Sequence, residues 1–596
     1  MRRGLILAAA AVVTVISGVL GAPASFGSVA ANVNTPGYYQ AIPRPVCGPG
    51  SNPETGFQGE VPLTDRLAGF KGFSCNLKLV GHYQGEGASW QHAWYGTCDY
   101  YDTANNQGTG PAKLGAQKHL GTVVLDVANP RHPRVTEYLT TPGMLHPWED
   151  LKVNKKRGLL AGAPNGGPPF DVYDVSKDCA HPRLLASVPM PNNGHEGEWE
   201  PDGRTYWGSS TQEYHAIDVT DPTHPREILT WKPAAGGTHG LSFSDDGDTA
   251  YVCDTGLPPV SNTEDGIQIL DISDIQHRRP HPKIRVIGSI YWPDSTECQT
   301  STPITIGGHH YLVMSSELGS GGLTHQSNYG CATGLLPYGI PRIINIDNPR
   351  HPKLVAKLTL QTDDPANCAI ATQETAGQVI FGYDSHYCSV DQQHNATALA
   401  CGYFNSGVRL FDIRDPYHPK EIAYFNPPAQ LDTTPVGTGS EGGVNSALAG
   451  SEHIGSKDAD WCSNRSRFYH APDGTWQLWV TCQDYGFMVL QVTNHAYPLG
   501  PSSPARRAST AYAATRTATV PGASAPIIPA PTRPVPKNLG TPAMRAALGF
   551  PVNLDAGTAP LLDRRVAPDR AIWGGAALLV AMAVGSAGAL RRRARR

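Results

Sequence analysis

Four histidines of this sequence stand where they could share one metal site. His146, His195 and His239 each lie eight residues before a polar turn that we expect to end an inner β-strand. His386 occupies a similar place in the stretch SHYCSVDQQHN. Neutral imidazole is a good ligand for Zn, Cu, Fe or Ni. The set therefore predicts a transition-metal site, provided that these strands surround a common axis.

Charged side chains near these histidines are further candidates for binding. We expect Glu149, Glu198 and Glu297 at the same mouth of the channel, because a carboxylate can complete a site built from imidazoles. A metal with an open coordination position would support hydrolysis or oxidation. Arg465 leads into another inner strand, where its guanidinium could bind an anionic ligand. The alternative is that all of these groups only hydrogen-bond buried backbone around a water-filled channel.

The elements that would position these residues are indicated by one phrase that recurs along the chain. A β-type run ends in Asp or Asn, continues with Val or Ile, and reaches a turn that closes on His-Pro, as in VVLDVANPRHP from Val123 and HAIDVTDPTHP from His215. Other copies, the last one degraded, begin at Asp171, Ile267, Arg342, Val408 and Phe487. The shorter intervals between copies, 44 to 53 residues, match a four-stranded propeller blade.

The repeat predicts an all-β fold, a seven-bladed β-propeller, with six or eight blades as the alternatives. In the blade after His195 we expect strands at 196–202, 205–211, 214–219 and 226–232, with Asp202-Gly203 as a hairpin turn. The seventh copy has no fourth strand after it. Leu77–Tyr83 resembles the other fourth strands, so we expect this N-terminal strand to close the last blade and leave no open sheet edge.

The recurring polar residues of the phrase are expected to be structural. The Asp that ends each third strand should accept backbone hydrogen bonds in the following turn. The histidines of the His-Pro turns lie at the periphery of the predicted ring, far from its axis. They are therefore not candidates for the metal site.

Both ends of the chain carry signals for a membrane. Arg2 and Arg3 precede an apolar run and a group of small residues, so residues 1–31 are predicted to be a cleavable export signal. Residues 571–590 form an uncharged apolar run long enough to span a bilayer, and the arginine-rich tail 591–596 would stay in the cytoplasm. Between them we predict an N-terminal extension at 32–74, the propeller at 75–495, and a disordered Pro- and Ala-rich stalk at 496–570.

Composition excludes some classes of function. A net charge of −4 over 596 residues gives no electrostatic footprint for nucleic acid. The 12 cysteines are even in number, and in an oxidising compartment they predict disulfides of undetermined pairing. No nucleotide loop, GxSxG elbow, HExxH or haem-attachment motif occurs, so no catalytic residue can be assigned. The bias toward Ala, Gly, Pro and Arg is typical of an actinomycete bacterium.

The repeated phrases resemble the LVIVD repeat family of exported bacterial β-propellers. The matching segments are VVLDV, VYDV, HAIDV, QILDI and RLFDI, and the resemblance covers roughly residues 75–495. It implies the propeller fold and a location at the cell surface, and it says little about chemistry. A more distant, fold-level likeness is to the selenium-binding protein and methanethiol oxidase group, which is also seven-bladed and His-bearing.

Three functions follow as hypotheses. The leading one is a monomeric, membrane-anchored binding module that takes an extracytoplasmic protein, a glycan or a small ligand through its loops. The second is a metal-dependent hydrolase or oxidase that uses the four histidines. The third is a purely architectural role in the cell envelope. Metal analysis of the purified protein separates the first two hypotheses.

Overall fold

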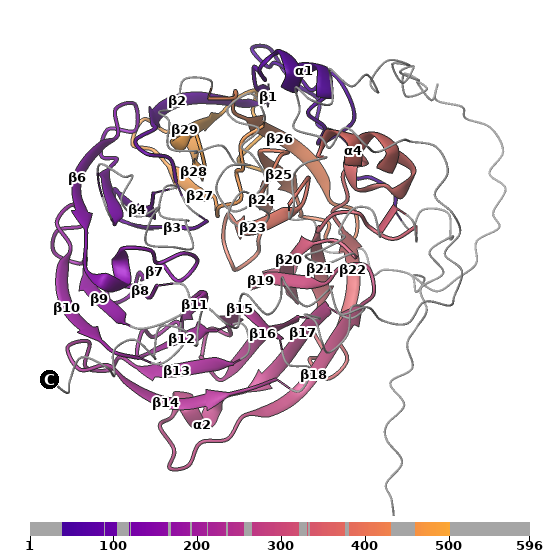
Figure 1. Cartoon of the computed structure of the whole chain (residues 1–596). Coiled ribbons are helices and arrows are strands. Elements are labelled where there is room, and N and C mark those ends of the chain that lie inside the picture. The colour runs from indigo at the N-terminus through magenta and orange to yellow at the C-terminus, as the bar shows by residue number, and fades with distance from the viewer. Residues whose placement is uncertain are drawn as a thin grey trace, which may run out of the picture.

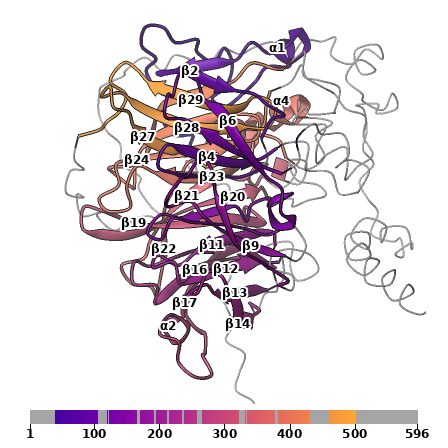
Figure 2. The same cartoon turned by 90° about the vertical axis from the view of Figure 1, so that its left-hand side faces the viewer.

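Seven antiparallel sheets form a closed ring in the computed structural model (Figure 1). The structure describes residues 39–500, except for 89, 104–118, 120, 165–168, 191–193, 211–212, 234–236, 256–264, 321–329, 332–333, 376–380 and 431–458. Seen edge-on, the strands run across the thickness of the ring (Figure 2). The all-β, seven-bladed propeller predicted from the repeat is confirmed.

Each blade has four strands in the order inner to outer. The first four blades comprise β3 (His92–Tyr95), β4 (Cys98–Asp102), β5 (Thr122–Asp126) and β6 (Arg134–Leu139); β7 (Lys152–Asn154), β8 (Leu159–Gly162), β9 (Phe170–Asp174) and β10 (Arg183–Val188); β11 (Glu196–Trp199), β12 (Thr205–Ser209), β13 (Tyr214–Asp218) and β14 (Arg226–Trp231); and β15 (Gly237–Phe243), β16 (Thr249–Thr255), β17 (Asp265–Asp271) and β18 (Arg285–Trp292). The remaining blades comprise β19 (Glu297–Ile306), β20 (His309–Leu318), β21 (Pro341–Asn345) and β22 (Lys353–Lys357); β23 (Ser385–Val390), β24 (Ala398–Tyr403), β25 (Val408–Asp412) and β26 (Lys420–Asn426); and β27 (Arg467–His470), β28 (Trp476–Cys482), β29 (Gly486–Val492) and β2 (Leu77–Tyr83).

The ring is closed by the N-terminal part of the propeller, as predicted. β2 pairs antiparallel with β29, so it supplies the outer strand of the blade that the C-terminal part begins. The short strand β1 (Phe73–Cys75) pairs with β26 and makes the sixth blade five-stranded. Pairing the first and last strands in one sheet removes the free edges that an open propeller would expose.

The repeated phrase forms the turn that leaves each third strand. Asp218 Oδ1 accepts the backbone N–H of Thr220 at 3.0 Å, as predicted, and its Oδ2 accepts from Arg226 of β14 at 3.2 Å. In the next turn Asp221 accepts from the Nδ1–H of His224 at 3.0 Å. In this copy the Asp and His side chains of the phrase therefore have hydrogen-bond partners within or near the turn, which gives them a structural role.

The predicted hairpin turn in the third blade is also confirmed. Gly203 adopts φ 72°, a left-handed conformation that costs glycine little and other residues more. The backbone N–H of Gly203 bonds to the carbonyl of Glu200 at 2.9 Å, which closes the turn between β11 and β12.

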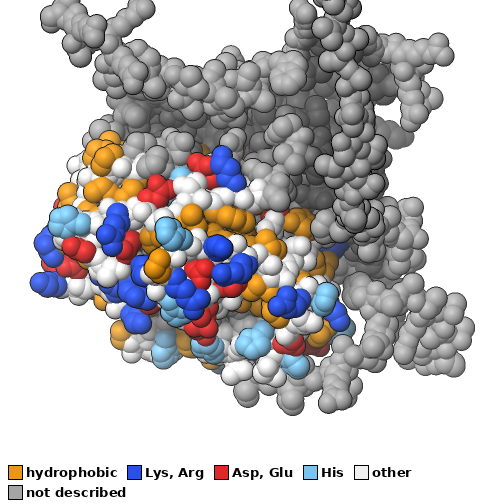
Figure 3. All heavy atoms as spheres, turned by 90° about the horizontal axis from the view of Figure 1, so that it is seen from below, with side chains coloured by type: hydrophobic (Ala, Val, Ile, Leu, Met, Phe, Trp, Pro, Cys, Tyr) orange, Lys and Arg blue, Asp and Glu red, His pale blue; other side chains and the backbone are white. Residues whose placement is uncertain are grey.

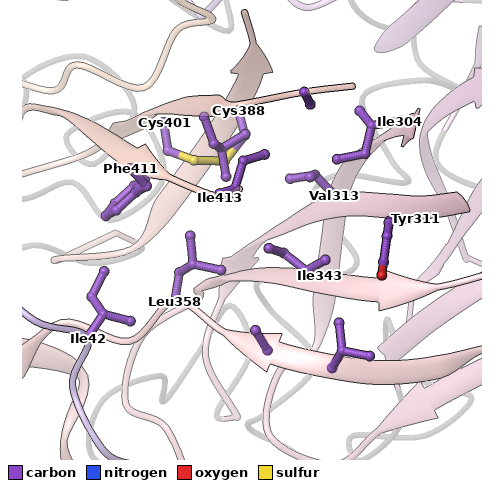
Figure 4. Close-up of a cluster of buried hydrophobic side chains, with 14 of the residues drawn as sticks. Ile42, Ile304, Tyr311, Val313, Ile343, Leu358, Cys388, Cys401, Phe411 and Ile413 are labelled. Atoms are coloured by element: carbon purple, nitrogen blue, oxygen red, sulfur yellow. A yellow bond between two sulfur atoms is a disulfide. The ribbon is translucent and has the colours of Figure 1, made fainter. Parts of the chain in front are cut away.

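Apolar side chains fill the spaces between neighbouring blades. Figure 4 shows one such cluster, which includes Ile304 and Ile343 of the fifth blade and Phe411 of the sixth. Ile42, from the segment before the propeller, adds to the same cluster. Burying a large aliphatic or aromatic side chain contributes about 1.5–3 kcal/mol, so these contacts hold adjacent blades at fixed positions around the axis.

All 12 cysteines form disulfides, which agrees with the prediction for an oxidising compartment. The pairs are Cys47–Cys75, Cys98–Cys179, Cys253–Cys298, Cys331–Cys368, Cys388–Cys401 and Cys462–Cys482. Cys98–Cys179 and Cys253–Cys298 each connect one blade to the next.

The described helices are short and lie outside the sheets. They are α1 (Leu63–Ala68), α2 (Ser273–Gln276), α4 (Cys368–Glu374) and the 3-10 turns η2 (Pro142–Met144), η3 (Gln361–Asp363) and η4 (Pro365–Asn367). α2 lies on the rim of the ring in both views (Figures 1 and 2). None of the described helices has the length and apolarity needed to cross a membrane. The predicted span 571–590, the export signal and the predicted stalk beyond residue 500 fall outside the described residues.

The face of the molecule seen from below carries charges of both signs side by side. Lys and Arg side chains alternate there with Asp, Glu and His (Figure 3). Over its described residues this face therefore has no broad region of one charge. This agrees with the near-neutral net charge of −4.

Candidate metal centre at the hub

Three histidines and two glutamates from five blades meet at the hub of the ring. His239 belongs to β15, His386 to β23 and Glu317 to the end of β20. His195 immediately precedes β11, and Glu149 stands shortly before β7. We refer to these five residues as the hub cluster. The convergence follows from the ring, because inner strands of all blades approach one axis.

Irregularities in strand pairing aim the ligating side chains at the hub. The pairing of β15 with β16 shifts register between Thr238 and Leu241, and that of β23 with β24 shifts between Ser385 and Cys388. His239 and His386 fall inside these two shifts. A bulge leaves a residue out of the ladder and turns its side chain, and bulges of this kind are frequent next to active sites.

One half of the hub cluster is centred on two facing imidazoles. The Nε2 atoms of His195 and His239 lie 3.0 Å apart. Each Nε2 lies 3.7 Å from Oε2 of Glu149. Oε1 of Glu317 is 3.4 Å from the Nε2 of His239. Two nitrogens and two carboxylate oxygens thus surround one small volume.

The other half of the hub cluster is centred on His386. Its Nε2 lies 3.0 Å from Oε1 of Glu149 and 2.9 Å from Oε2 of Glu317. Neither contact has hydrogen-bond alignment, and both the Nε2 of His386 and the Oε2 of Glu149 are buried without a hydrogen-bond partner. Buried polar atoms of this kind are costly unless something else satisfies them. A metal ion would do so, because it needs lone pairs that point at it and no hydrogen.

The far sides of two imidazoles are held by backbone carbonyls. Nδ1–H of His239 donates to the carbonyl of Gln299 at 3.0 Å, and Nδ1–H of His386 donates to that of Ser463 at 3.1 Å. These bonds fix the tautomer and leave a lone pair on each Nε2 of the neutral ring. Metal-binding histidines are oriented in the same way in most metalloproteins.

Burial and mutual contact shift the protonation of the hub cluster. Burial lowers the pKa of His195 to about 4, with repulsion from His239 acting in the same direction. Burial opposes the charge of Glu149, but the imidazoles of His386, His239 and His195 outweigh it and lower the pKa of Glu149. His386 shows the converse balance, since Glu149 and Glu317 overcome burial and raise its pKa. His195 is therefore neutral and Glu149 ionised near pH 7, the states in which both can ligate a metal.

Glu297, one of the predicted site residues, lies next to the hub cluster. Its carboxylate, that of Glu317 and the imidazole of His239 offer ligand atoms within 4.8 Å of one another. Burial, followed by repulsion from Glu317, raises the pKa of Glu297 well above its usual value. Glu297 is thus a neutral neighbour that could become a ligand by losing its proton to an incoming cation.

Three of the predicted site residues, His146, Glu198 and Arg465, do not belong to the hub cluster. His146 turns its Nδ1 to Oδ2 of the buried Asp102 at 3.1 Å, and its ring packs edge-on against Trp148. Arg465 Nη1 pairs with Oε2 of Glu198 at 3.2 Å, and this pair lies beside Tyr387. His195, His239, His386, Glu149 and Glu297 are brought together.

A second polar network adjoins the hub cluster. Glu196 forms a backbone bridge with Glu149, and its carboxylate accepts from Lys152 at 2.8 Å and from the hydroxyl of Tyr387. Burial raises the pKa of Glu196 to about 8. Lys152 and Arg465 both lie over the ring of Tyr387, so this network extends from the hub cluster to the Arg465–Glu198 pair.

Aromatic rings cover the other flank of the hub cluster. Trp90 lies 5.4 Å from the ring of His386 and 5.1 Å from that of Trp148. Trp148 in turn lies 6.4 Å from the ring of His195. Its φ of 51° is unusual for a bulky residue and is the kind of strained backbone found at functional sites.

Glu317 is the site residue that sequence reasoning missed. It is the penultimate residue of β20, the second strand of its blade, whereas the predicted site residues lie on first strands or lead into them. The stretch YLVMSSEL carries one signal, a carboxylate close to the end of a strand that begins as an apolar run. A charged residue in such a place is rarely buried unless it has a partner.

Comparison with known proteins does not assign this chain to a family. No protein-family model matches the chain, and no curated protein matches its sequence. A solved structure of a Lactobacillus plantarum protein is similar at 13% sequence identity and a TM-score of 0.36, and the match covers 56% of this chain and 87% of that one. Hydrazine synthase of Kuenenia stuttgartiensis is similar at 11% identity and a TM-score of 0.40, with 69% of this chain and 97% of that one covered. Sqt1 of Saccharomyces cerevisiae is similar at 9% identity and a TM-score of 0.42, with 70% of this chain and 99% of that one covered. At these identities and scores the similarity carries no argument about function. The resemblance to the LVIVD family stays a prediction.

Proposed function

We propose that this protein is a metal-dependent hydrolase whose metal is held by the hub cluster. The observation that carries the proposal is the convergence of three imidazoles and two carboxylates on one buried volume, with the Nε2 of His386 and the Oε2 of Glu149 lacking hydrogen-bond partners. A propeller fold by itself supports a binding or interaction module in general. The hub cluster is what argues for chemistry beyond binding.

The donor set restricts the metal. Nitrogen and carboxylate donors suit Zn, Fe, Cu, Ni or Mn, whereas Mg and Ca prefer oxygen alone. The disulfides exclude every cysteine from ligation, since all 12 are paired. We therefore expect a transition metal of borderline hardness.

A substrate would approach the metal past His195. The side chain of His195 is 20% exposed, whereas those of His239, His386 and Glu149 are at most 2% exposed. Trp148 flanks the same side and offers an apolar surface for the non-reacting part of a substrate. The position opposite the buried ligands is then the one left for water or substrate.

His146 is the group best suited to move a proton at this opening. Asp102 accepts its Nδ1–H, which orients the ring and leaves Nε2 as a base. The ring of Trp148 contacts the rings of both His146 and His195, so the base stands one aromatic ring away from a ligand. A carboxylate–histidine pair near this opening could take a proton from metal-bound water, and on this ground we favour hydrolysis over oxidation.

Location is part of the same proposal. Six disulfides are expected of a protein outside the cytoplasm. We propose that the propeller acts outside the cell as a monomer, tethered through residues 571–590, on a small molecule that reaches the hub from solvent.

The test is metal analysis of the full-length protein purified from an oxidising host. We expect stoichiometric transition metal in the wild type and its loss in His239→Ala. His224→Ala, which removes an exposed histidine of a peripheral turn, is the matched control and should keep the metal. A wild type that neither contains nor takes up Zn²⁺ or Mn²⁺ would remove the basis of the proposal.

Activity is tested on p-nitrophenyl acetate and p-nitrophenyl phosphate. His146→Gln should retain the metal and lower kcat by about 10²–10⁴, the usual contribution of a general base. Equal loss of metal and activity in this variant would show that His146 supports the site structurally and not as a base.

A further inference from the structure

We propose that the hub cluster holds two metal ions, bridged by the carboxylates of Glu149 and Glu317. The inference rests on the proposed metal function and adds the number of ions and the class of group they would bind. It follows from which oxygen of each carboxylate faces which imidazole.

The first ion would lie between His195 and His239. Ligand atoms about 2.0–2.2 Å from one ion are roughly 3.0–3.7 Å from each other, depending on the angle between them. The Nε2 atoms are 3.0 Å apart, and Oε2 of Glu149 is 3.7 Å from both. All three distances fit ligands of one ion.

The second ion would lie beside His386. Its Nε2 is 3.0 Å from Oε1 of Glu149 and 2.9 Å from Oε2 of Glu317. These are again the distances between adjacent ligands of one ion. His386 makes neither contact as a hydrogen bond, and loss of its Nε2 proton to an incoming cation would give its lone pair to the ion.

The two sets use different oxygens of the same two carboxylates. Glu149 presents Oε2 to His195 and His239, and Oε1 to His386. Glu317 presents Oε1 to His239 and Oε2 to His386. A carboxylate that gives one oxygen to each of two ions is the usual bridge in two-metal sites, where the ions lie about 3.5–4 Å apart.

Charge balance gives the class of ligand. Glu149, Glu317 and Glu297 carry at most three negative charges in the buried hub. Two dications carry four positive charges, so at least one positive charge remains even if all three carboxylates are ionised. A two-ion centre therefore favours an anionic group in its remaining position, such as a phosphate ester or a carboxylate.

The test counts Mn²⁺ ions on the full-length protein by elemental analysis after gel filtration, with electron paramagnetic resonance of the same samples. We expect two ions per chain in the wild type and a coupled spectrum, because neighbouring Mn²⁺ ions interact magnetically. His195→Ala and His386→Ala each remove a histidine from one set and should leave one ion with the six-line spectrum of isolated Mn²⁺. His224→Ala should keep two.

The outcomes separate this inference from the proposed function. One ion in the wild type, with an uncoupled spectrum, overturns the two-ion centre and leaves the metal function standing. No ion overturns both. Since His386→Ala could fail to fold, His386→Gln and the melting temperature accompany it, and the wild-type count decides the matter in any case.

Discussion

Glu149 is the residue on which the energetics of the hub depend. Transfer of a carboxylate from water into a protein interior costs several kcal/mol unless it is paired. The side chain is 2% exposed and lies among three imidazoles, yet its Oε2 has no hydrogen-bond partner. The protein therefore retains a carboxylate that is only partly satisfied. A cation at this oxygen would offset that cost.

Gly240 offers a test of how the imidazole of His239 is positioned. A Cβ atom at this residue would lie 2.2 Å from the carbonyl oxygen of Gln299, the same oxygen that holds Nδ1–H of His239. Gly240→Ala should push β15 away from β19 and misdirect the ring. We expect metal affinity to fall about 10–100-fold, as measured by competition with a chromogenic chelator.

The control for this prediction is Gly500→Ala. At Gly500 the nearest atom of the described residues to a Cβ would be Nη1 of Arg414 at 3.8 Å, so this variant should bind metal as the wild type does. Unchanged affinity in Gly240→Ala would mean that the bond to Gln299 does not orient the ligand.

At the scale of elements, one turn explains why a sequence rule failed for His146. Counting eight residues back from the turn located His195 and His239 but also selected His146. Before β7 the chain makes a tight turn, in which the N–H of Asp150 bonds to the carbonyl of Pro147 at 2.9 Å. This turn displaces His146 toward Asp102 and brings Glu149 to the hub. Spacing therefore predicts the position of a residue only where the segment that leads into the inner strand follows the same course in each blade.

Strand irregularity also limited what could be predicted of the other ligands. The blades, the hairpin at Gly203 and the closing strand β2 follow from repeats and turn residues, which are local features. Glu317 reaches the hub from a second strand, and His386 lies within a register shift. Which ligand atoms face each other at the hub depends on β-bulges and on contacts between neighbouring blades. Neither can be predicted from the sequence of a single segment.

The Asp of the repeated turn should make the protein sensitive to acid. Burial opposes ionisation of Asp218, but hydrogen bonds from Thr220 and the charge of Arg278 lower its pKa to about 2. A lowered pKa gives stability that is present above about pH 4 and is lost as the pH falls toward 2. Asp218→Asn should lower the free energy of unfolding at pH 7, because it removes the charge of this carboxylate. The expected loss is only about 1 kcal/mol, because the ion pair with Arg226 is well exposed to solvent and contributes little.

The measurement is urea unfolding of both proteins at pH 7, 4 and 2.5. The difference between variant and wild type should shrink as the pH falls, because the wild type loses the advantage of its carboxylate. Asn itself fits the turn, since Asn345 occupies the equivalent place in the fifth blade and accepts the N–H of Asp347 at 3.2 Å. A difference that does not change with pH would contradict the assignment.

At the scale of the whole molecule, disulfides between blades should stabilise more than those within a blade. Cys98–Cys179 links neighbouring blades and spans 81 residues, whereas Cys388–Cys401 joins adjacent strands and spans 13. In the chain-entropy account, stabilisation grows with the logarithm of the loop. Cys98→Ala with Cys179→Ala should cost about 1.5 kcal/mol more than Cys388→Ala with Cys401→Ala, as measured by urea unfolding. Equal costs would show that native-state packing outweighs loop length here.

The pairing of β2 with β29 determines when the propeller ring can close during folding. During synthesis β2 emerges among the first strands, but its partner is made only after the other six blades. Until then the nascent chain exposes an unpaired strand, and the hub lacks its full circle of neighbours. Folding of the propeller therefore ends with one late step, the pairing of β2 with β29. Before this step the chain depends most on chaperones.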